Sequence, residues 1–334
     1  MKVLYIYRSP QMGISIDNVF RPIEREMHKK CEVDSITFEN TNYSLSSLIQ
    51  NIITVKKYLK KHPDTIVHIT GTENYLLPFL KKYKTVVTVH DLGFYSILSD
   101  GIKKRIKKML FVDSLRLASK VTFISDSSFN EGRKLVDFEK NQCVTIENPV
   151  NEKFVKDDSY HFDSECPTIL QVGTKINNKN LERTAEALVG INCQFRIIGP
   201  LSNERKEKLN KLGLNFVQKQ NLTNEEIIEE YQHCDIVSFA SLYEGFGMPI
   251  IEGQAAGKAV VTSNFPPMSD VAAGSCVLVD PHSVDSIRKG IIEAIKNHEK
   301  YELLGQENVK RYSVKVKAAE YFSVYKEVME SDGQ

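Results

Sequence analysis

The chain has 334 residues, a length that predicts two domains of roughly 150 residues each rather than one core. Its 44 basic and 43 acidic residues leave a net charge of +1, which argues against a nucleic-acid partner for the chain as a whole. A hydrophobic fraction of 41% with 26% charged residues is typical of a globular protein and excludes one that is largely disordered.

Short β-branched apolar runs recur along the chain, and each is followed by a turn and a helical pattern. They lie at residues 2–7, 65–70, 84–90, 120–125, 168–173, 194–199, 235–240 and 259–263. Strands that are apolar throughout and alternate with helices indicate parallel sheets covered on both faces. The sequence therefore predicts an α/β protein with two doubly wound domains in tandem.

Two segments stand apart from this alternation. Residues 150–168 are highly charged, lose the apolar period and contain Pro167, which is typical of a linker. Residues 314–328 have helical spacing and no strand after them, so we expect a final helix that packs elsewhere in the chain.

The cysteines and the amino-terminal segment indicate the compartment. Six cysteines are scattered without C-x-x-C spacing, which favours reduced thiols over a disulfide framework or a zinc site. The apolar run at residues 2–7 stops at Arg8 and is too short for a signal peptide. No stretch approaches the roughly 20 apolar residues of a membrane span. We expect a cytoplasmic protein.

Residues 101–110 predict a basic amphipathic helix. Its apolar stripe consists of Ile102, Ile106, Met109 and Leu110, and its basic residues are Lys103, Lys104, Arg105, Lys107 and Lys108. Such a helix can lie on an anionic membrane surface. The alternative is a core-packed helix with a solvated polar face, and the pattern leaves both open.

In open parallel sheets, ligands bind beyond the carboxyl ends of the strands, so residues that directly follow strands are candidates. These are Gly13 after the first strand, His90 after residues 84–89, and the turn from Gly173 and Thr174 to Lys179. Lysines beside a helix start suit an anion. Each also has a plain alternative: a turn glycine, a histidine bonded to local backbone, or solvated lysines.

Residues 242–261 read LYEGFGMPIIEGQAAGKAVV, with two glutamates seven residues apart around a Gly-x-Gly. Pro249 suits the first turn of a helix and Gly257 suits its end, which places Glu244 in the preceding loop and Glu252 about one turn inside. The amides at the helix start suit a diphosphate, and the carboxylates suit sugar hydroxyls. This combination points to a nucleotide sugar.

Three other interpretations fit the spacing. A dinucleotide oxidoreductase would have a third glycine where Ile250 stands. A glycosidase needs two carboxylates facing each other about 5 to 9 Å apart, which spacing cannot establish. The third is a capped helix with surface glutamates.

The same segment resembles the donor-site signature of glycosyltransferase family 4, retaining enzymes of the GT-B fold. Further blocks match in order and spacing, most strongly over residues 85–300: TVHDLGFY, ISDSSFNEG, VTIENPVNEKF, ILQVGTKINNKNLERTAEAL, FRIIGP, LTNEEIIEEYQHCDIVSFASLYEGFG and VLVDP. The resemblance implies two facing Rossmann-like domains. Residues 1–155 would bind the acceptor, together with a final helix at 313–334 that crosses back to them, and residues 156–312 would bind the donor.

The resemblance also implies residue roles. Glu244 matches the glutamate that contacts the transferred sugar, Glu252 the one that binds the nucleotide ribose, and His90 the histidine of the catalytic site. Lys179 matches the phosphate-binding lysine, and Leu222 lies where the base-contacting segment is expected. The donor-binding positions are then Gly13, Gly173, Thr174, Lys179, Leu222, Phe246, Gly247, Met248 and Glu252.

The sequence departs from the family pattern in three places. Thr174 stands where many members have an arginine that binds phosphate, and Lys175 or Arg196 could take its role. Gly13 stands alone where relatives often have two glycines, and Asn148-Pro149 replaces a more common order near the hinge.

The resemblance implies a retaining hexosyltransferase that uses a UDP- or GDP-sugar, needs no metal or other cofactor, and acts on a glycan or lipid-linked acceptor in surface polysaccharide synthesis. Peripheral contact with the inner face of the membrane through Lys103 to Lys108 is a further expectation. The alternatives are a nucleotide-sugar epimerase of the same fold and a non-catalytic module that binds nucleotide sugars.

Overall fold

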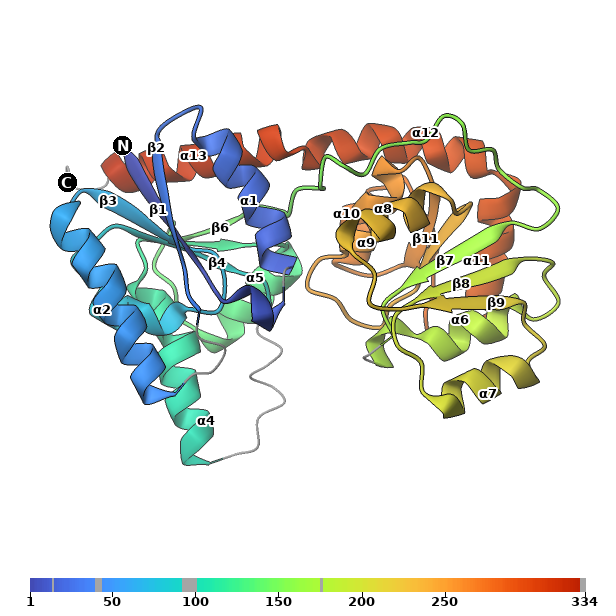
Figure 1. The fold of residues 1–334 in the computed structure, drawn as a ribbon, viewed down its shortest axis with the longest axis horizontal. Coiled ribbons are helices and arrows are strands. Elements are labelled where there is room, and N and C mark those ends of the chain that lie inside the picture. Colours follow the sequence, from blue (N-terminus) through green and yellow to red (C-terminus); the bar gives the residue numbers. More distant parts are fainter. Residues whose placement is uncertain (14, 40–43, 92–100, 175–176, 331–334) are drawn as a thin grey trace. The chain divides into compact units, whose positions relative to one another are not determined.

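The structure is a computed structural model that describes residues 1–334 except 14, 40–43, 92–100, 175–176 and 331–334. The chain forms two compact units, which are coloured along the sequence in Figure 1. Unit 1 comprises Met1–Pro149 and Val314–Gln334, and unit 2 comprises Val150–Ser313. Residues 150–167, within the segment predicted as a linker, form no helix or strand and belong to unit 2.

Unit 1 is built on a parallel sheet with strand order β2-β1-β3-β4-β5-β6. Its strands are β1 (Lys2–Tyr7), β2 (Glu32–Thr37), β3 (Thr65–Ile69), β4 (Thr85–Val89), β5 (Lys120–Phe123) and β6 (Cys143–Thr145). Its helices are α1 (Ser15–Met27), α2 (Leu45–Lys61), α4 (Ile102–Lys107), α5 (Asp126–Leu135) and α13 (Val314–Glu330). Short helical turns lie at Pro10–Met12, Asn74–Phe79, Lys108–Val112 and Asp113–Leu117.

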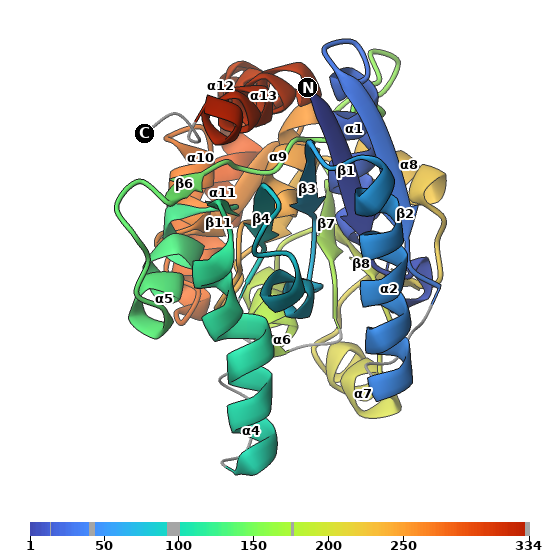
Figure 2. The same cartoon turned by 90° about the vertical axis from the view of Figure 1, so that its left-hand side faces the viewer.

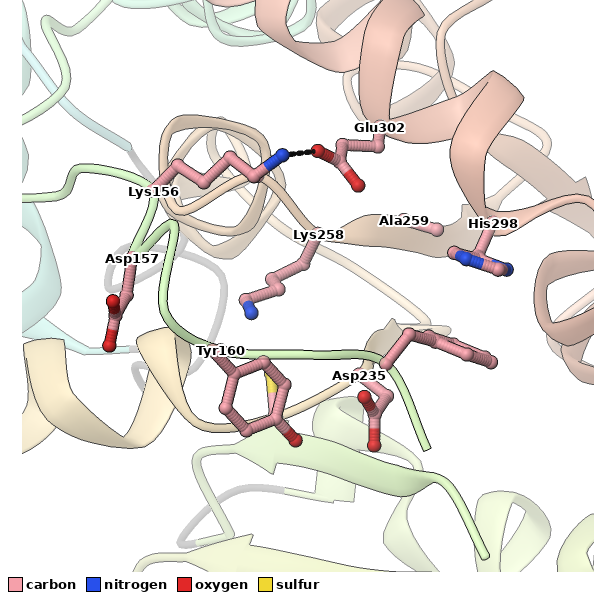
Figure 3. A pocket seen from close by; sticks show the side chains of 11 residues that line it. Lys156, Asp157, Tyr160, Asp235, Lys258, Ala259, His298 and Glu302 are labelled. Atoms are coloured by element: carbon pink, nitrogen blue, oxygen red, sulfur yellow. Dashed lines mark hydrogen bonds and ion pairs between the residues drawn. The ribbon is translucent and has the colours of Figure 1, made fainter. Parts of the chain in front are cut away.

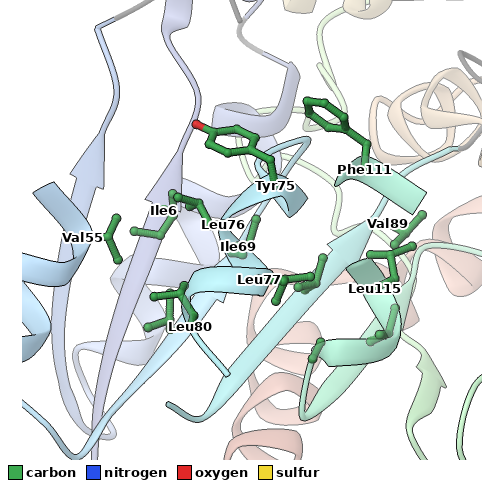
Figure 4. Close-up of a cluster of buried hydrophobic side chains, with 14 of the residues drawn as sticks. Ile6, Val55, Ile69, Tyr75, Leu76, Leu77, Leu80, Val89, Phe111 and Leu115 are labelled. Carbon is green, nitrogen blue, oxygen red and sulfur yellow. The ribbon is translucent and has the colours of Figure 1, made fainter. Parts of the chain in front are cut away.

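Successive side chains of a strand point to opposite faces of the sheet. In β1 the side chains on both faces are buried. In β1, Val3, Tyr5 and Tyr7 pack with α1 and α13 on one face. Leu4 and Ile6 pack on the other face with α2 and the turns after β3, a cluster drawn in Figure 4. Figures 1 and 2 show α1 and α13 side by side over the first of these faces.

Unit 2 has a second parallel sheet, with strand order β12-β11-β10-β7-β8-β9. Its strands are β7 (Thr168–Val172), β8 (Gln194–Ile198), β9 (Phe216–Lys219), β10 (Ile236–Phe239), β11 (Ala259–Ser263) and β12 (Val277–Val279). Its helices are α6 (Leu181–Leu188), α7 (Asn203–Lys211), α8 (Asn224–Gln232), α9 (Met248–Ala255), α10 (Met268–Ala272), α11 (Val284–Lys296) and α12 (His298–Val309), with short turns at Asn177–Lys179 and Lys310–Tyr312.

The basic segment at 101–110 is helical from Ile102 onward, as predicted, but only its first part is α-helical. Helix α4 ends at Lys107, and a π-helical turn follows over Lys108–Val112. Ile106 and Met109 remain 49% and 57% exposed, whereas the core contact is made by Phe111 and Val112 just beyond. Two apolar side chains among basic ones are therefore open to solvent. No helix of the described segments has the length and apolar character to cross a bilayer.

The last helix, α13, is held to the first sheet by a buried hydrogen-bond network centred on His68 of β3. The imidazole Nδ1 lies 2.6 Å from the Tyr325 hydroxyl, and Nε2 lies 2.9 Å from Thr88 Oγ1. The Tyr325 hydroxyl also donates to Tyr5, and Thr88 lies 3.2 Å from the Tyr321 hydroxyl. His68 is fully buried, and burial lowers its pKa to about 3.

This network predicts a specific loss of stability in acid. Because the pKa of His68 is about 3 in the fold and about 6.5 when unfolded, the unfolded chain binds the extra proton between these values. The free energy of unfolding should therefore fall as pH drops below about 6.5, by up to about 1.4 kcal/mol per pH unit from this group. We expect urea unfolding of His68→Gln to depend less steeply on pH between 6.5 and 4.

The exposed His28 of unit 1 supplies the matched control, His28→Gln. The free energy of unfolding of His28→Gln should depend on pH as steeply as that of the wild type. An identical slope for wild type and His68→Gln would contradict the assignment of the acid effect to His68.

Candidate functional site

The order of strands in unit 2 creates a ligand crevice at a defined place. From β7 the chain adds β8 and β9 on one side of the sheet and then β10, β11 and β12 on the other side. The strand order therefore reverses between β7 and β10. In open α/β sheets, ligands bind at such a reversal, outside the carboxyl ends of the strands. The two loops that meet there follow β7 and β10, and they carry Gly173 to Lys179 and Glu244 to Gly247.

Lys179 lies across the turn that leaves β7. Gly173 has a φ of +91°, and a Cβ at this position would lie 3.1 Å from Lys179 Cε. A larger residue would thus be strained and would push the lysine away. The Lys179 ammonium lies 4.9 Å from the centre of the Phe239 ring at the end of β10, so glycine and phenylalanine together direct it toward the second loop.

The central contact of the site joins the two loops. Lys179 Nζ forms an ion pair with Glu244 Oε1 at 2.6 Å, and both side chains are mostly buried. The structure therefore brings together the lysine and the first glutamate that the sequence singles out. Their charges compensate each other, and a ligand anion would have to compete with Glu244 for the ammonium.

Asparagine side chains fix the two loops in register. Asn178 Nδ2 donates to the Tyr243 carbonyl at 2.7 Å, and the Leu242 amide donates to the Asn178 carbonyl at 2.7 Å. Asn180 Nδ2 donates to the Ala240 and Pro281 carbonyls. Sequence reasoning missed both asparagines, because asparagine in a polar loop carries no distinguishing pattern.

Helix α9 begins directly after this loop. Gly247 precedes it with a φ of +123°, Pro249 lies in its first turn, and Gly257 follows its end, as the sequence predicts. Glu252 lies inside the helix, and its Oε2 accepts a hydrogen bond of 2.7 Å from the buried Tyr231 hydroxyl of α8. Burial raises the pKa of Glu252, opposed by that hydrogen bond and by the charge of Lys179.

The remaining positions predicted for unit 2 lie at the same edge of the sheet. Met248 starts α9, while the Phe246 side chain is buried and packs on Tyr312 at 5.8 Å between ring centres. Thr174 is buried, and its hydroxyl donates to the Pro200 carbonyl after β8. Leu222 follows β9 and precedes α8.

The loop that follows β7 is also held by an arginine that the sequence pattern does not single out. Arg205 of α7 donates to the Thr174 carbonyl and to Asn177 Oδ1, and it pairs with Glu182 at 2.8 Å. Arg196, in contrast, donates to the His233 carbonyl and to Gln194. Its guanidinium is thus engaged away from the loop, and Lys175 lies outside the described residues.

Unit 1 has a cavity of about 470 Å³ at the carboxyl edge of its own sheet. Its walls include Arg8, Ile16, Asn74, His90, Asp91 and Phe111. His90 Nε2 donates to the Thr70 carbonyl at 2.9 Å, which leaves Nδ1 as an acceptor. Burial lowers the pKa of His90, so its imidazole is neutral at pH 7. The Gly13 carbonyl accepts from Arg8 at 3.1 Å.

A smaller cavity in unit 2, of about 70 Å³, lies at the opposite edge of the second sheet (Figure 3). Lys258, just before β11, places its ammonium 4.1 Å from the centre of the Tyr160 ring. Asp235, just before β10, accepts from the Thr168 and Asp163 amides. This edge attaches the linker to the sheet and has room for no more than a few water molecules.

The second unit is similar in sequence to known proteins. Residues 152–311 match the family model of glycosyl transferases group 1. An uncharacterized glycosyltransferase of Methanocaldococcus jannaschii is 28% identical over 188 residues, which are 53% of this chain and 50% of that protein. The O-antigen chain mannosyltransferase B of Escherichia coli is 23% identical over 271 residues, 72% of this chain and 67% of that one. The alignment thus spans from half to two thirds of these relatives.

Solved structures show the same fold over nearly the whole chain. A glycosyltransferase of Rickettsia africae superposes with a TM-score of 0.76 at 18% identity, covering 98% of both chains. Anabaena Alr3699/HepE, solved in complex with UDP and glucose, superposes with a TM-score of 0.73 at 15% identity, covering 98% of this chain and 100% of that one. Residues 152–311 are therefore similar to the domain of glycosyl transferases group 1, and the chain as a whole has the α/β architecture of the GT-B fold.

Proposed function

We propose that this chain is a retaining glycosyltransferase that moves a hexose from a UDP- or GDP-sugar to a hydroxyl group of a glycan or lipid-linked saccharide. The family match of unit 2 supports the transfer reaction, and the likeness to an O-antigen mannosyltransferase supports a role in bacterial surface polysaccharide synthesis. The observation that carries the proposal is the Lys179–Glu244 pair at the strand reversal of unit 2. In this proposal unit 2 binds the donor and unit 1 the acceptor.

The pair explains how one site could bind both a diphosphate and a sugar. The diphosphate would take over the Lys179 ammonium, because it carries two negative charges where a carboxylate carries one and would contact the amide end of α9 as well. Glu244 would then be free to accept hydrogen bonds from hydroxyls of the hexose. The Lys179 ammonium would then be paired with Glu244 in the free protein and with the diphosphate in the donor complex.

The other contacts proposed for the donor lie at the same carboxyl edge of the second sheet. Tyr231 holds Glu252 Oε2, so Oε1 can accept from a ribose hydroxyl. Gly173 and Thr174 would form the turn beside the phosphates, and Leu222 would border the base. The amides from Phe246 to Met248 would bind the diphosphate or the sugar.

Retention is proposed to proceed by attack of the acceptor on the face from which the diphosphate leaves, with the departing phosphate taking the acceptor proton. In this mechanism no residue of the protein attacks the sugar, and Glu244 stabilises the reacting hexose instead. Lys179 and the α9 terminus supply positive charge for the leaving group, which supports a reaction that needs no metal. His90 would accept from a sugar hydroxyl through Nδ1.

Two alternatives remain within the same fold: a nucleotide-sugar epimerase and a module that only binds. Incubation with UDP-glucose or GDP-mannose in the absence of acceptor separates them from a transferase. An epimerase changes the sugar, a silent module returns it unchanged even when saccharide acceptors are added, and a transferase requires the acceptor for product.

The exposed Ile106 and Met109 beside Lys104 and Arg105 support a second proposal, that unit 1 contacts an anionic membrane surface. Such contact would bring a cytoplasmic enzyme to a lipid-linked acceptor.

The Lys179–Glu244 pair predicts opposite effects on transfer and on nucleotide binding. Glu244→Gln should lower kcat by about 100-fold or more, because the sugar loses a charged contact at its reacting centre. The affinity for UDP or GDP should stay the same or rise, because Lys179 loses its competitor. Enzyme kinetics and calorimetric titration measure the two effects, with the exposed Glu229→Gln as control. Wild-type turnover in Glu244→Gln would refute its role.

Arg205 is predicted to act on donor binding through the loop that it supports. Arg205→Ala removes the contacts with Thr174 and Asn177, and we expect a rise of about tenfold in the Kd of the donor nucleotide. Lys211→Ala, at the exposed end of the same helix, should leave that Kd unchanged. Equal Kd values for Arg205→Ala and wild type would show that the loop keeps its shape unaided.

The membrane proposal predicts that Lys104→Glu combined with Arg105→Glu lowers binding to phosphatidylglycerol vesicles at least tenfold, since each basic residue contributes about 1 kcal/mol. Ile106→Ser with Met109→Ser should weaken binding as well. The control is Lys60→Glu with Lys61→Glu, the same charge change at the end of α2. Cosedimentation measures binding, and equal binding of all variants would refute contact through this segment.

A further inference from the structure

Glu73 is a buried carboxyl group that the proposed reaction does not yet use. It follows β3, precedes the helical turn Asn74–Phe79, and is only 2% exposed. Its Oε1 accepts a long hydrogen bond of 3.4 Å from Thr72 Oγ1. Its Oε2 is buried and has no hydrogen-bond partner among the described residues. Unpartnered buried carboxylate oxygens are costly, so one that persists calls for an explanation.

The position of Glu73 in the fold suggests that explanation. In the first sheet, the strand order reverses between β1 and β3, and residues that follow these two strands line the ligand crevice of such a sheet. Arg8 follows β1 and Glu73 lies in the loop after β3. The unpartnered Oε2 lies over Gly71, which lines the 470 Å³ cavity, at 3.2 Å from where a Cβ of that glycine would be.

Arg8 carries the complementary unsatisfied group. Its Nη2 donates to the Gly13 carbonyl and to Ser15 Oγ, but its Nε is buried and unpartnered within the described part of the chain. The guanidinium is close enough for its charge to act on Glu73, whose pKa burial nevertheless raises to about 7. One buried acceptor and one buried donor thus adjoin the same cavity, and each lacks the partner that the other could supply.

The walls of the cavity indicate the class of ligand. Positive charge from Arg8 and Lys107 is balanced by Asp91 and by Glu73 nearby, which does not favour an anion. Ile16, Val89 and Phe111 provide apolar surface, and Asn74 Oδ1 is a further buried acceptor without a partner among the described residues. Apolar walls with a few fixed polar groups suit the ring and hydroxyls of a sugar, and the volume is typical of a small-molecule site.

We propose that Glu73 is a positioning residue of this cavity: when an acceptor binds, the Glu73 carboxylate comes to accept from Arg8 Nε, which lacks that partner in the free protein, and so orients the guanidinium to bind a hydroxyl of a neutral saccharide acceptor. The inference rests on the proposed glycosyl transfer for the identity of the ligand, but the orientation of Arg8 by Glu73 does not depend on it. Glu73 itself does not touch the reacting atoms.

The first test measures Arg8 directly and requires no activity. The Nε–H resonance of Arg8, assigned by its loss in Arg8→Lys, should shift with pH in the wild type with a midpoint near 7 and should not shift in Glu73→Gln. Adding methyl α-mannopyranoside should move this resonance in the wild type. A pH-independent Arg8 resonance in the wild type would overturn the positioning role, whatever reaction the protein catalyses.

The second test uses steady-state transfer from GDP-mannose to methyl α-mannopyranoside, and from UDP-glucose to methyl α-glucopyranoside. Glu73→Gln should raise the KM of the acceptor about tenfold, which is the loss of one charged hydrogen bond, and leave the KM of the donor unchanged. The wild-type acceptor KM should fall as pH rises through about 7, where Glu73 becomes charged, and Glu73→Gln should lack this change. Titration of His90 gives a separate effect below pH 6.5, which both proteins should keep.

Glu24 provides the matched control, because it is also buried in unit 1 but is fully engaged. Its Oε2 accepts from the Tyr7 hydroxyl and from Arg21. Glu24→Gln should lower Tm without changing the acceptor KM, and Glu73→Gln should change the acceptor KM without lowering Tm. An unchanged acceptor KM and pH profile in Glu73→Gln would refute the role in acceptor binding. Absence of transfer in the wild type refutes the proposed function instead and leaves the resonance of Arg8 to decide the positioning role.

Discussion

The site in unit 2 depends on one constraint, the adjacency of β7 and β10 in a parallel sheet. Because both strands run the same way, the loops that leave them emerge at one edge, although about 65 residues of sequence separate Lys179 from Glu244. The ion pair between these residues, the asparagine bonds between their loops and the start of α9 all follow from that adjacency. Without that pairing, Lys179 and the turn at Gly173 would lie apart from Glu244 and the start of α9.

The same rule places the second site. In unit 1 the strand order reverses between β1 and β3, and Arg8, Glu73 and His90 gather at the edge where these strands and β4 end. The two units differ in how they satisfy their polar groups. In unit 2 the charges of Lys179 and Glu244 compensate each other, whereas in unit 1 buried atoms of Arg8 and Glu73 lack partners among the described residues. A structure that holds unsatisfied groups beside a cavity is prepared for a polar ligand.

The sequence predicts the inner strands and the order of elements well, because these strands are apolar throughout. It misses β2, β6, β9 and β12, which form the outer edges of the two sheets. Edge strands are short or carry polar residues, so their pattern resembles that of a loop. Within the site, Lys179 and Glu244 follow predicted strands and could be found, but Arg205 and Tyr231 act from helices whose sequence gives no sign of it. Arg8 directly follows a predicted strand, and the rule that singled out His90 would also have found it.

We infer that the Lys179 ammonium exchanges Glu244 for the diphosphate of a nucleotide sugar. Calorimetric titration of UDP and GDP into the wild type and Lys179→Met measures this exchange. One of the two nucleotides should bind the wild type, and its Kd should rise at least tenfold in Lys179→Met, because the diphosphate loses its charged partner. Equal affinity in the two proteins, or no binding of either nucleotide to the wild type, would refute the exchange.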